Sequence, residues 1–320
     1  MNTTNFGADY HSLWVLSKNS AIGQVASEEL WYYTVVYQSH QTGFLYMYRV
    51  ARAFPFDDLD RPFLSDVPPD LIKHTAGPKS FEEFQKTAFE VATMFEAATT
   101  KHAGKRLTDF DSVLDFGCGA GRLLQFFSPE KQKISGCDVN RPLISFMEKH
   151  FPKADIYQNK TEPKLKWAAN SFDLVISFSV FSHLTRDSED RWLTELERVG
   201  RPGAIYLITF QGDWCIESKF PIPVQNKLRK AGFHYFDIHT PKGSVMDFPS
   251  NYGSSVHTAD YVRNEWSRTF DILEVYKGRP PSLYDHENLT SVHRKALANV
   301  RSMGQDMVVL RKRLSGTSEP

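Results

Sequence analysis

The sequence predicts an α/β fold in which helices cover both faces of a seven-stranded, doubly wound and mostly parallel sheet. The first observation behind this prediction is Ser112–Leu124, where a short apolar strand runs into a glycine-rich turn and then into a helical pattern. The second is that further short apolar strands alternate with amphipathic segments towards the C-terminus. Such alternation is typical of a parallel sheet whose crossover helices lie on its two faces.

The turn after the first strand contains Gly117, Gly119 and Gly121 and is preceded by Asp115. Glycine lets the backbone turn tightly and approach a ligand, and a helix beginning at Arg122 would offer free N–H groups to that ligand. A dinucleotide-binding loop has the different spacing G-x-G-x-x-G, whose last glycine packs the helix closely against a pyrophosphate. Because arginine occupies that last position here, the spacing argues against a dehydrogenase and favours a nucleotide-type ligand without pyrophosphate.

The pattern D-x-G-x-G-x-G resembles the first motif of the class I, or Rossmann-like, S-adenosylmethionine-dependent methyltransferases. The resemblance continues through FDLV at 172–175 and ELERVGRPGAIYLITF at 195–210, and it covers roughly residues 79–312. One departure is Ala204, which stands where the family has the second glycine of a turn. The stretch from His257 resembles bacterial members of small-molecule, glycan and secondary-metabolite pathways. The resemblance implies S-adenosylmethionine as the cofactor, with loop contacts from Asp115, Gly117, Cys118, Gly119 and Gly121.

Composition narrows the class of protein. Lys and Arg together equal Asp and Glu together at 38 each, so no net field attracts nucleic acid or an anionic membrane. No apolar run approaches the ~18 residues of a membrane span, and the N-terminus lacks the pattern of a secretory signal. The three cysteines form neither a disulfide framework nor a metal-binding spacing. We expect a cytoplasmic protein with no metal, no nucleic-acid partner and no membrane partner.

Residues 1–78 lie outside the resemblance and are rich in aromatic residues, with strand-like stretches at 31–36 and 43–50. They predict an accessory lobe that packs these rings as its own core; the alternative is a lid over the substrate or an arm of a homodimer. A phosphate-loop interpretation of His74–Ser80 fails because the required glycine spacing is absent. The following stretch, Ser80–Ala97, has the N-cap and apolar spacing of a helix, which by resemblance walls the cofactor site.

A second strand, Lys133–Asp138, is expected to end in an acid 21 residues after Gly117. A carboxylate there can accept hydrogen bonds from both ribose hydroxyls, and the alternative is that Asp138 only caps the next helix. We assign Asp138 and the adjoining Val139 to the cofactor. By resemblance, Asn159, which follows a third strand at 154–158, reads the adenine amine; a turn-forming role is the alternative.

The fourth strand is predicted over Ser171–Ser179, with Asp173 as a structural residue at its start. Its carboxyl end should face the cofactor, with the Phe178 backbone near the amino-acid end. This end lacks the Asp/Asn-Pro-Pro-aromatic sequence of the nucleobase-amine methyltransferases, which argues against that substrate. His183 follows directly and is the candidate catalytic base, because an imidazole pKa suits proton transfer. The alternative for His183 is a hydrogen bond to the backbone at a helix entry.

The remaining elements are a helix at 189–199, a turn at Pro202–Gly203, a strand at 204–210, a helix at 259–268, and strands at 270–276 and 306–311 that form a final antiparallel hairpin. A further helix is placed at 291–300, and 313–320 is a tail. Residues 211–256 interrupt the alternation and are expected to be a lid-like insertion that roofs the substrate site. Arg122 either neutralises the cofactor carboxylate or faces solvent on its helix, and the helical position favours solvent.

The predicted function is methyl transfer from S-adenosylmethionine to an oxygen or nitrogen atom of a small-molecule acceptor. Two other classes of function are considered. A non-catalytic cofactor-binding partner subunit would keep the glycine loop without acceptor chemistry, and a protein methyltransferase would need a groove for its substrate. Nothing in the sequence identifies the acceptor or its reacting atom.

Overall fold

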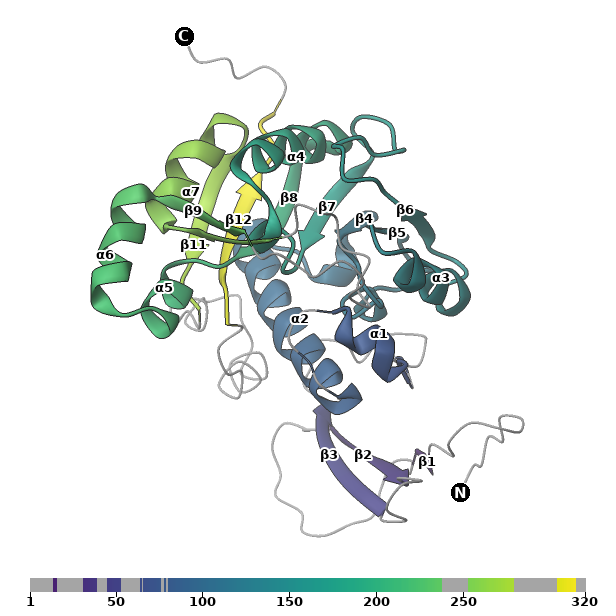
Figure 1. Cartoon of the computed structure of the whole chain (residues 1–320). Helices are drawn as coiled ribbons and strands as arrows, with labels where there is room; N and C mark the ends of the chain where they lie inside the picture. The colour runs from purple at the N-terminus through teal and green to yellow at the C-terminus, as the bar shows by residue number, and fades with distance from the viewer. Residues whose placement is uncertain are drawn as a thin grey trace.

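The computed structural model describes residues 64, 66–75, 78, 80–237, 253–278 and 304–314, and the backbone of three strands before them (Figure 1). The helix expected at 291–300 and the end of the tail lie outside the described residues, as do 238–252 of the insertion. No helix among the described residues is long and apolar enough to cross a membrane.

A seven-stranded sheet forms the centre of the molecule and confirms the predicted fold class. Its strand order is β11-β12-β8-β7-β4-β5-β6. The strands are β4 (Ser112–Phe116), β5 (Lys133–Asp138), β6 (Asp155–Gln158), β7 (Phe172–Ser177), β8 (Gly200–Phe210), β11 (Asp271–Tyr276) and β12 (Asp306–Arg311). The strands from β6 to β8 pair in parallel, whereas β12 runs antiparallel to both β8 and β11. The antiparallel pair of β11 and β12 at this edge of the sheet is the one expected at the end of the chain.

Helices cover both faces of the sheet because each strand alternates its buried side chains between two cores. Val113 of β4 packs in one core with α2 (Phe81–Ala103) and α3 (Arg141–His150). Leu114, the next residue, packs in the other core with α4 (Arg186–Val199) and α7 (Ala259–Glu265). The short helix η4 (Trp266–Arg268) continues α7. The sheet is therefore doubly wound, as the alternation of strands and helices predicts.

Local signals set the helix ends. Ser80 caps α2 by accepting a hydrogen bond from the Glu83 N–H at 3.2 Å, as expected. The helix then runs past the predicted end at Ala97 and stops at Gly104, whose φ of 64° is the left-handed conformation of a C-terminal glycine. In α3 the capping side chain is Asn140, which accepts from the Leu143 N–H. Asp138 does not cap this helix.

The helix expected after the glycine loop is absent, and only a short 3₁₀ turn, η2 (Leu124–Phe126), forms there. All of residues 122–127 are buried, whereas an amphipathic surface helix would expose one side. Phe126 packs edge-on against Phe89 of α2, with ring centroids 5.1 Å apart. The prediction of a helix beginning at Arg122 is wrong because the segment fills the space between α2 and the sheet.

The turn expected at Pro202–Gly203 lies inside β8, which begins at Gly200. Gly203 has a φ of 81°, and the pairing of β7 with β8 shifts register nearby. The insertion contains α5 (Asp213–Lys219), α6 (Ile222–Ala231) and an antiparallel pair of strands, β9 (Phe233–Asp237) and β10 (Gly253–His257).

The part of the chain before α2 contains an antiparallel sheet of β1 (Trp14–Val15), β2 (Trp31–Gln38) and β3 (Leu45–Arg52). The two longer strands match the expected strand-like stretches. A short helix, α1 (Pro69–Lys73), follows and buries Ile72 in the core beside α2. The packing of the aromatic rings of β2 and β3 lies outside the described residues.

A buried polar cluster joins the insertion to α4. The Glu189 carboxylate accepts from Trp266 Nε1 at 2.8 Å and from the Tyr261 hydroxyl at 3.0 Å, and it lies 2.5 Å from His257 Nε2. Glu189 and His257 are both fully buried. Because a buried carboxylate is costly unless it is hydrogen-bonded, these donors fix the end of β10 against α4.

Candidate functional site

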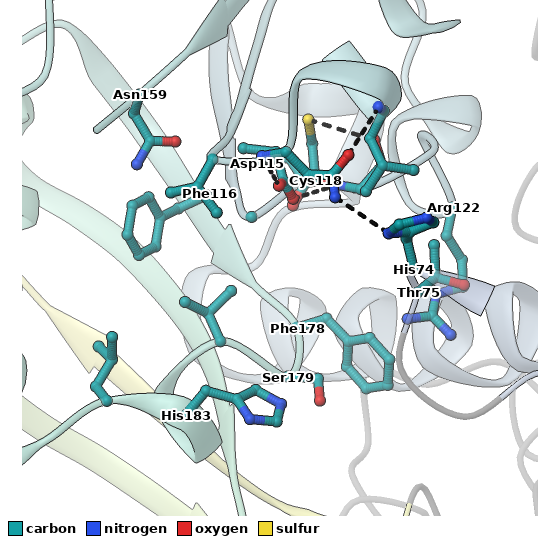
Figure 2. A pocket seen from close by; sticks show the side chains of 18 of the residues that line it. His74, Thr75, Asp115, Phe116, Cys118, Arg122, Asn159, Phe178, Ser179 and His183 are labelled. Atoms are coloured by element: carbon teal, nitrogen blue, oxygen red, sulfur yellow. Dashed lines mark hydrogen bonds between the residues drawn. The ribbon is translucent and has the colours of Figure 1, made fainter. Parts of the chain in front are cut away.

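A cavity lies at the carboxyl ends of β4, β5 and β7, with the glycine loop on one side and the 3₁₀ helix η3 (Phe181–His183) on the other (Figure 2). Ligands of open α/β sheets bind outside this edge. Nine of the ten predicted site residues line the cavity: Asp115, Gly117, Cys118, Gly119, Asp138, Val139, Asn159, Phe178 and His183. The sequence pattern therefore selected residues that the fold brings together in space.

Gly117 and Gly121 have the same φ of 80° but different surroundings. A Cβ atom on Gly117 would lie 2.1 Å from Val180 Cγ2, so only glycine lets the loop approach the residues after β7. A Cβ atom on Gly121 would lie 2.6 Å from both Met147 and Phe151 of the α3 region. Gly121 does not line the cavity; its lack of a side chain allows the loop to pack against α3.

The Asp138 carboxylate lies at the tip of β5 and holds the glycine loop. Its Oδ2 accepts from the Gly119 N–H at 3.1 Å, and its Oδ1 accepts from the Asn140 N–H at 2.8 Å. Burial raises the pKa of Asp138, an effect that these two backbone N–H groups partly offset. Each oxygen has a further lone pair, so the carboxylate has acceptor capacity left for ligand hydroxyls.

Asp115 is only 2% exposed. Burial, together with the nearby Asp138, raises the pKa of Asp115 to about 8 against the opposing effect of Arg122. Arg122 also lines the cavity, 8% exposed, with its guanidinium carbon 4.6 Å from the centre of the Phe178 ring. The expectation that Arg122 faces solvent is wrong, because without the predicted helix its side chain turns between Phe178 and α2.

At the adenine end expected from the sequence, Asn159 is buried and lines the cavity beside Val139. Its Nδ2 donates to the Lys160 carbonyl at 2.8 Å, and its backbone N–H donates to the Asp138 carbonyl at 3.2 Å. The side chain is thus held at the cavity wall by a local hydrogen bond.

Ser179 follows Phe178 and has a φ of 64°, which is uncommon for a residue other than glycine. Its N–H donates to Thr209 Oγ1 of β8 at 2.8 Å, and its hydroxyl accepts from Gln305 Nε2 at 2.7 Å. These contacts hold the strained turn that places the Phe178 ring in the cavity. Ser179 also lines the cavity and was not predicted.

His183 of η3 lies 2.8 Å, at Nδ1, from the carbonyl oxygen of Gly253 in β10. A carbonyl oxygen only accepts hydrogen bonds, so Nδ1 carries the hydrogen and the lone pair is on Nε2. Burial lowers the pKa of His183, and the hydrogen bond to Gly253 partly offsets this effect. The imidazole is therefore neutral near pH 7 and keeps a basic nitrogen.

His74 and Thr75 line the cavity from the end of α1, although they precede the predicted start of the domain. A Cβ atom on Gly119 would lie 3.5 Å from the Thr75 methyl carbon, which places Thr75 over the glycine loop. Neither residue belongs to a recognisable motif, so only the fold reveals them.

Residues 113–203 match a family described as a methyltransferase domain. The match spans β4, the glycine loop, Asp138, Asn159 and His183, which are the elements that build the cavity. This part of the chain is therefore similar to a methyltransferase domain.

The curated relatives of this chain are distant. A mouse protein named arginine-hydroxylase NDUFAF5, mitochondrial, is 25% identical over 205 residues, covering 62% of this chain and 59% of the relative. The chain thus spans about three fifths of that relative's length. The ubiquinone biosynthesis O-methyltransferase of Agrobacterium fabrum is 27% identical over 96 residues, covering 29% of this chain and 38% of the relative.

Two solved structures are also similar to this chain. The 1,6-didemethyltoxoflavin-N1-methyltransferase of Burkholderia thailandensis, with bound 1,6-didemethyltoxoflavin and S-adenosylhomocysteine, has a TM-score of 0.45 at 15% identity, covering 73% of this chain and 81% of that chain. A methyltransferase of Methanosarcina mazei described as S-adenosylmethionine-dependent has a TM-score of 0.44 at 16% identity, covering 65% and 95%.

The cofactor of this class of methyltransferase is S-adenosylmethionine, and the cavity fits it chemically. Two carboxyl groups, Asp115 and Asp138, line the cavity and suit a ligand that has a sulfonium and an ammonium group, whose positive charge would favour their ionised form. The Arg122 guanidinium suits the carboxylate of the same ligand. We find no described residue in the cavity that conflicts with this cofactor.

Proposed function

We propose that the protein transfers a methyl group from S-adenosylmethionine to an oxygen or nitrogen atom of a small-molecule acceptor, with His183 as the general base. The observation that carries this proposal is that His183 lines the same cavity as the glycine loop and Asp138. A neutral imidazole with its lone pair on Nε2 can take a proton from a hydroxyl acceptor as the new bond forms.

Bound S-adenosylmethionine supplies an electrophilic methyl group on a sulfonium, whose sulfur leaves without needing a proton. The acceptor lone pair forms the new bond to the methyl carbon as the carbon–sulfur bond breaks, and the acceptor proton passes to His183 Nε2. The protein's contribution is therefore position, exclusion of water and proton removal. Asp138, Asn159 and the glycine loop hold the cofactor in this proposal, and the Phe178 ring contacts Arg122 next to it.

An aromatic and apolar lining supports a small acceptor. Phe116, Phe178, Leu184 and Trp192 line the cavity together with the polar residues. The net charge of zero favours neither nucleic acid nor an anionic membrane as partner. All three cysteines are free and buried, which supports the cytoplasm as the compartment.

A screen with S-adenosylmethionine labelled at the methyl group tests this function. We expect label to pass to phenol, alcohol or amine acceptors in the presence of the wild-type protein. His183→Ala should lower kcat for a hydroxyl acceptor by roughly 10²–10⁴-fold without changing the affinity for S-adenosylhomocysteine. Full activity of His183→Ala over the whole pH range would show that His183 is not the general base. Cofactor binding without transfer to any acceptor would favour a partner subunit.

A protein acceptor is the second candidate, because the mouse relative is named as an arginine-hydroxylase. Incubation of the protein with a peptide library and labelled cofactor separates the two candidates. A mass gain of one methyl group on arginine peptides, and none on small acceptors, would establish the protein acceptor. A gain of one oxygen atom would identify hydroxylation and contradict methyl transfer.

A further inference from the structure

The end of α1 is joined to the cofactor cavity by a hydrogen bond between two side chains. His74 Nδ1 lies 3.2 Å from Asn140 Nδ2 (Figure 2 shows the His74 ring at the cavity beside Thr75). Asn140 follows Asp138 by two residues and is 3% exposed. The contact therefore lies immediately beside the carboxylate assigned to the ribose.

The N-cap of α3 fixes which way the Asn140 amide points. Its Oδ1 accepts from the Leu143 N–H at 3.2 Å, so its Nδ2 is the atom that faces His74. An amide nitrogen only donates, and His74 Nδ1 must then accept. The hydrogen of the neutral His74 ring is consequently on Nε2, which has no hydrogen-bond partner among the described residues.

A ribose diol needs both kinds of partner. Its hydroxyls donate to a carboxylate such as Asp138, and each hydroxyl oxygen can also accept a hydrogen bond. Asp138 is acceptor-only when ionised and cannot supply that second contact.

We propose that His74 is a cofactor-binding residue that donates from Nε2 to the ribose beside Asp138. Residues 113–203 match the methyltransferase family, so this donor comes from outside the matched domain. Thr75 covers the glycine loop from the same segment. The inference rests on the cofactor of the proposed function and is independent of the acceptor and of His183.

Calorimetric titration of the full chain with S-adenosylhomocysteine and 5′-methylthioadenosine tests the inference. The second ligand keeps the ribose but lacks the amino-acid group. His74→Asn retains an oxygen that can accept from Asn140 and removes the donor at the Nε2 position, whereas His74→Gln places an amide at that position. The exposed neighbour Lys73, changed to Ala, is the matched control.

We expect His74→Asn to weaken both ligands by a similar factor of roughly three to ten, the effect of one lost hydrogen bond. His74→Gln should weaken them less, and Lys73→Ala should bind as the wild type does. Wild-type affinity in His74→Asn would overturn the inference. A loss for S-adenosylhomocysteine alone would place His74 at the amino-acid end and overturn it too.

A larger loss in His74→Gln than in His74→Asn would assign the effect to the Asn140 contact, which only His74→Asn retains, and would contradict donation from Nε2. A wild-type protein that binds neither ligand would overturn the cofactor site itself, and the inference with it. Thermal unfolding of each variant confirms that the folded state is being compared. These outcomes do not depend on methyl transfer, so a failure to find an acceptor leaves the test of His74 intact.

Discussion

The Nδ1 atom of His183 lies 2.8 Å from the backbone carbonyl oxygen of Gly253, a residue seventy positions further along the chain. Gly253 begins β10, and a second residue of the same strand also contacts η3, because the Ser255 hydroxyl donates to the Phe181 carbonyl at 2.9 Å. At its other end, β10 is fixed to α4 through His257 and Glu189. The insertion thus supports the turn that contains the candidate base.

Removing the Ser255 hydroxyl should loosen η3 without touching the cofactor side of the cavity. We expect Ser255→Ala to lower kcat severalfold, because the buried Phe181 carbonyl loses its partner at a cost of about 1–3 kcal/mol. The affinity for S-adenosylhomocysteine should not change. Ser254→Ala is the control, since the Ser254 hydroxyl accepts from Gln211 and forms no hydrogen bond to η3. Similar kinetics for the two variants would contradict a positioning role for β10.

Two aspartates at strand ends should respond differently to the same substitution. Asp138→Asn is expected to weaken S-adenosylhomocysteine by about 1–3 kcal/mol, because a charged acceptor for the ribose is lost. Asp173 accepts from the Ser112 N–H at 2.7 Å and the Asp111 N–H at 2.9 Å, which ties β7 to β4. Asp173→Asn should therefore lower the melting temperature and leave ligand affinity unchanged. Calorimetry and thermal unfolding on both variants check this. Weaker ligand binding in Asp173→Asn together with unchanged binding in Asp138→Asn would contradict both assignments.

Gly117 and Gly104 form a pair that separates backbone strain from steric overlap. Both have positive φ, 80° and 64°, but a Cβ atom at Gly104 would meet nothing within 4 Å. Gly104→Ala should cost only the strain of a left-handed residue, about 1–2 kcal/mol, with normal cofactor affinity. Gly117→Ala should cost more and also weaken the cofactor, since its Cβ overlaps Val180.

A double variant makes the overlap with Val180 testable. Adding Val180→Ala to Gly117→Ala removes the Cγ2 atom, which would otherwise lie 2.1 Å from the new Cβ atom. Part of the lost free energy of unfolding should return in the double variant, as measured by denaturant titration. No recovery would mean that strain alone explains the loss at Gly117.

Local patterns in the sequence were sufficient for the sheet and for most of the cavity. The strand Lys133–Asp138 and the strand Asp306–Arg311 match the structure in their bounds, because short apolar runs between turn residues define them well. The glycine spacing placed three loop residues of the cavity, Gly117, Cys118 and Gly119, because a positive φ and close approach require glycine at fixed steps. Asp138 and Asn159 followed from their places at the ends of strands.

Long-range contacts account for what the sequence did not reveal. The segment after Gly121 has a helical pattern, but burial on all sides against α2 replaces the helix with a 3₁₀ turn, and that change turns Arg122 into the cavity. His74 reaches the cavity only because α1 packs beside α2 and meets the N-cap of α3. The Gly253 partner of His183 depends on the path of the insertion, which no short motif encodes.

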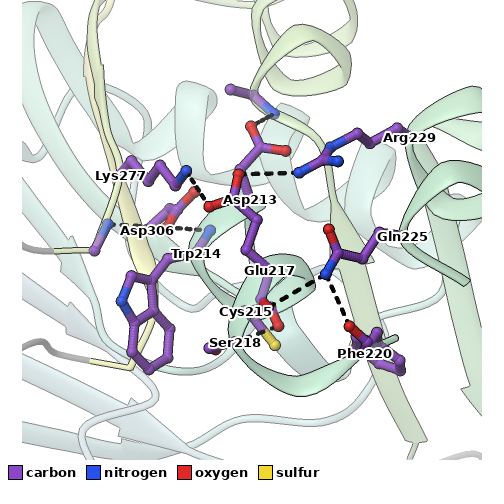
Figure 3. A network of polar contacts seen from close by, with 12 residues as sticks. Asp213, Trp214, Cys215, Glu217, Ser218, Phe220, Gln225, Arg229, Lys277 and Asp306 are labelled. Carbon is purple, nitrogen blue, oxygen red and sulfur yellow. Dashed lines mark hydrogen bonds and ion pairs between the residues drawn. The ribbon is translucent and has the colours of Figure 1, made fainter. Parts of the chain in front are cut away.

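Asp306, at the start of β12, is fully buried next to the insertion (Figure 3). Its Oδ1 accepts from the Gly278 N–H at 2.9 Å and the Trp214 N–H at 3.3 Å, whereas its Oδ2 has no partner among the described residues. Burial raises the pKa of Asp306, the two N–H groups oppose this and the Asp213 charge adds to it, with a net pKa of about 7. The folded state therefore keeps a proton that the unfolded chain releases near the ordinary value of 3.8.

The sign of the pH effect follows from that difference. Between pH 4 and 7 the unfolded state binds fewer protons than the folded state, so the free energy of unfolding should fall as the pH rises. In Asp306→Asn the free energy of unfolding should fall less over this pH range. The contribution of Asp306 to the fall amounts to a few kcal/mol, at roughly 1.4 kcal/mol per pKa unit. A further decrease in the free energy of unfolding, which continues up to about pH 8, should disappear in Asp115→Asn, because the pKa of Asp115 is raised to about 8. Urea unfolding of the three proteins at pH 5, 6.5 and 8 measures both parts, and a wild-type slope in Asp306→Asn would show that its carboxyl is already ionised in the folded protein.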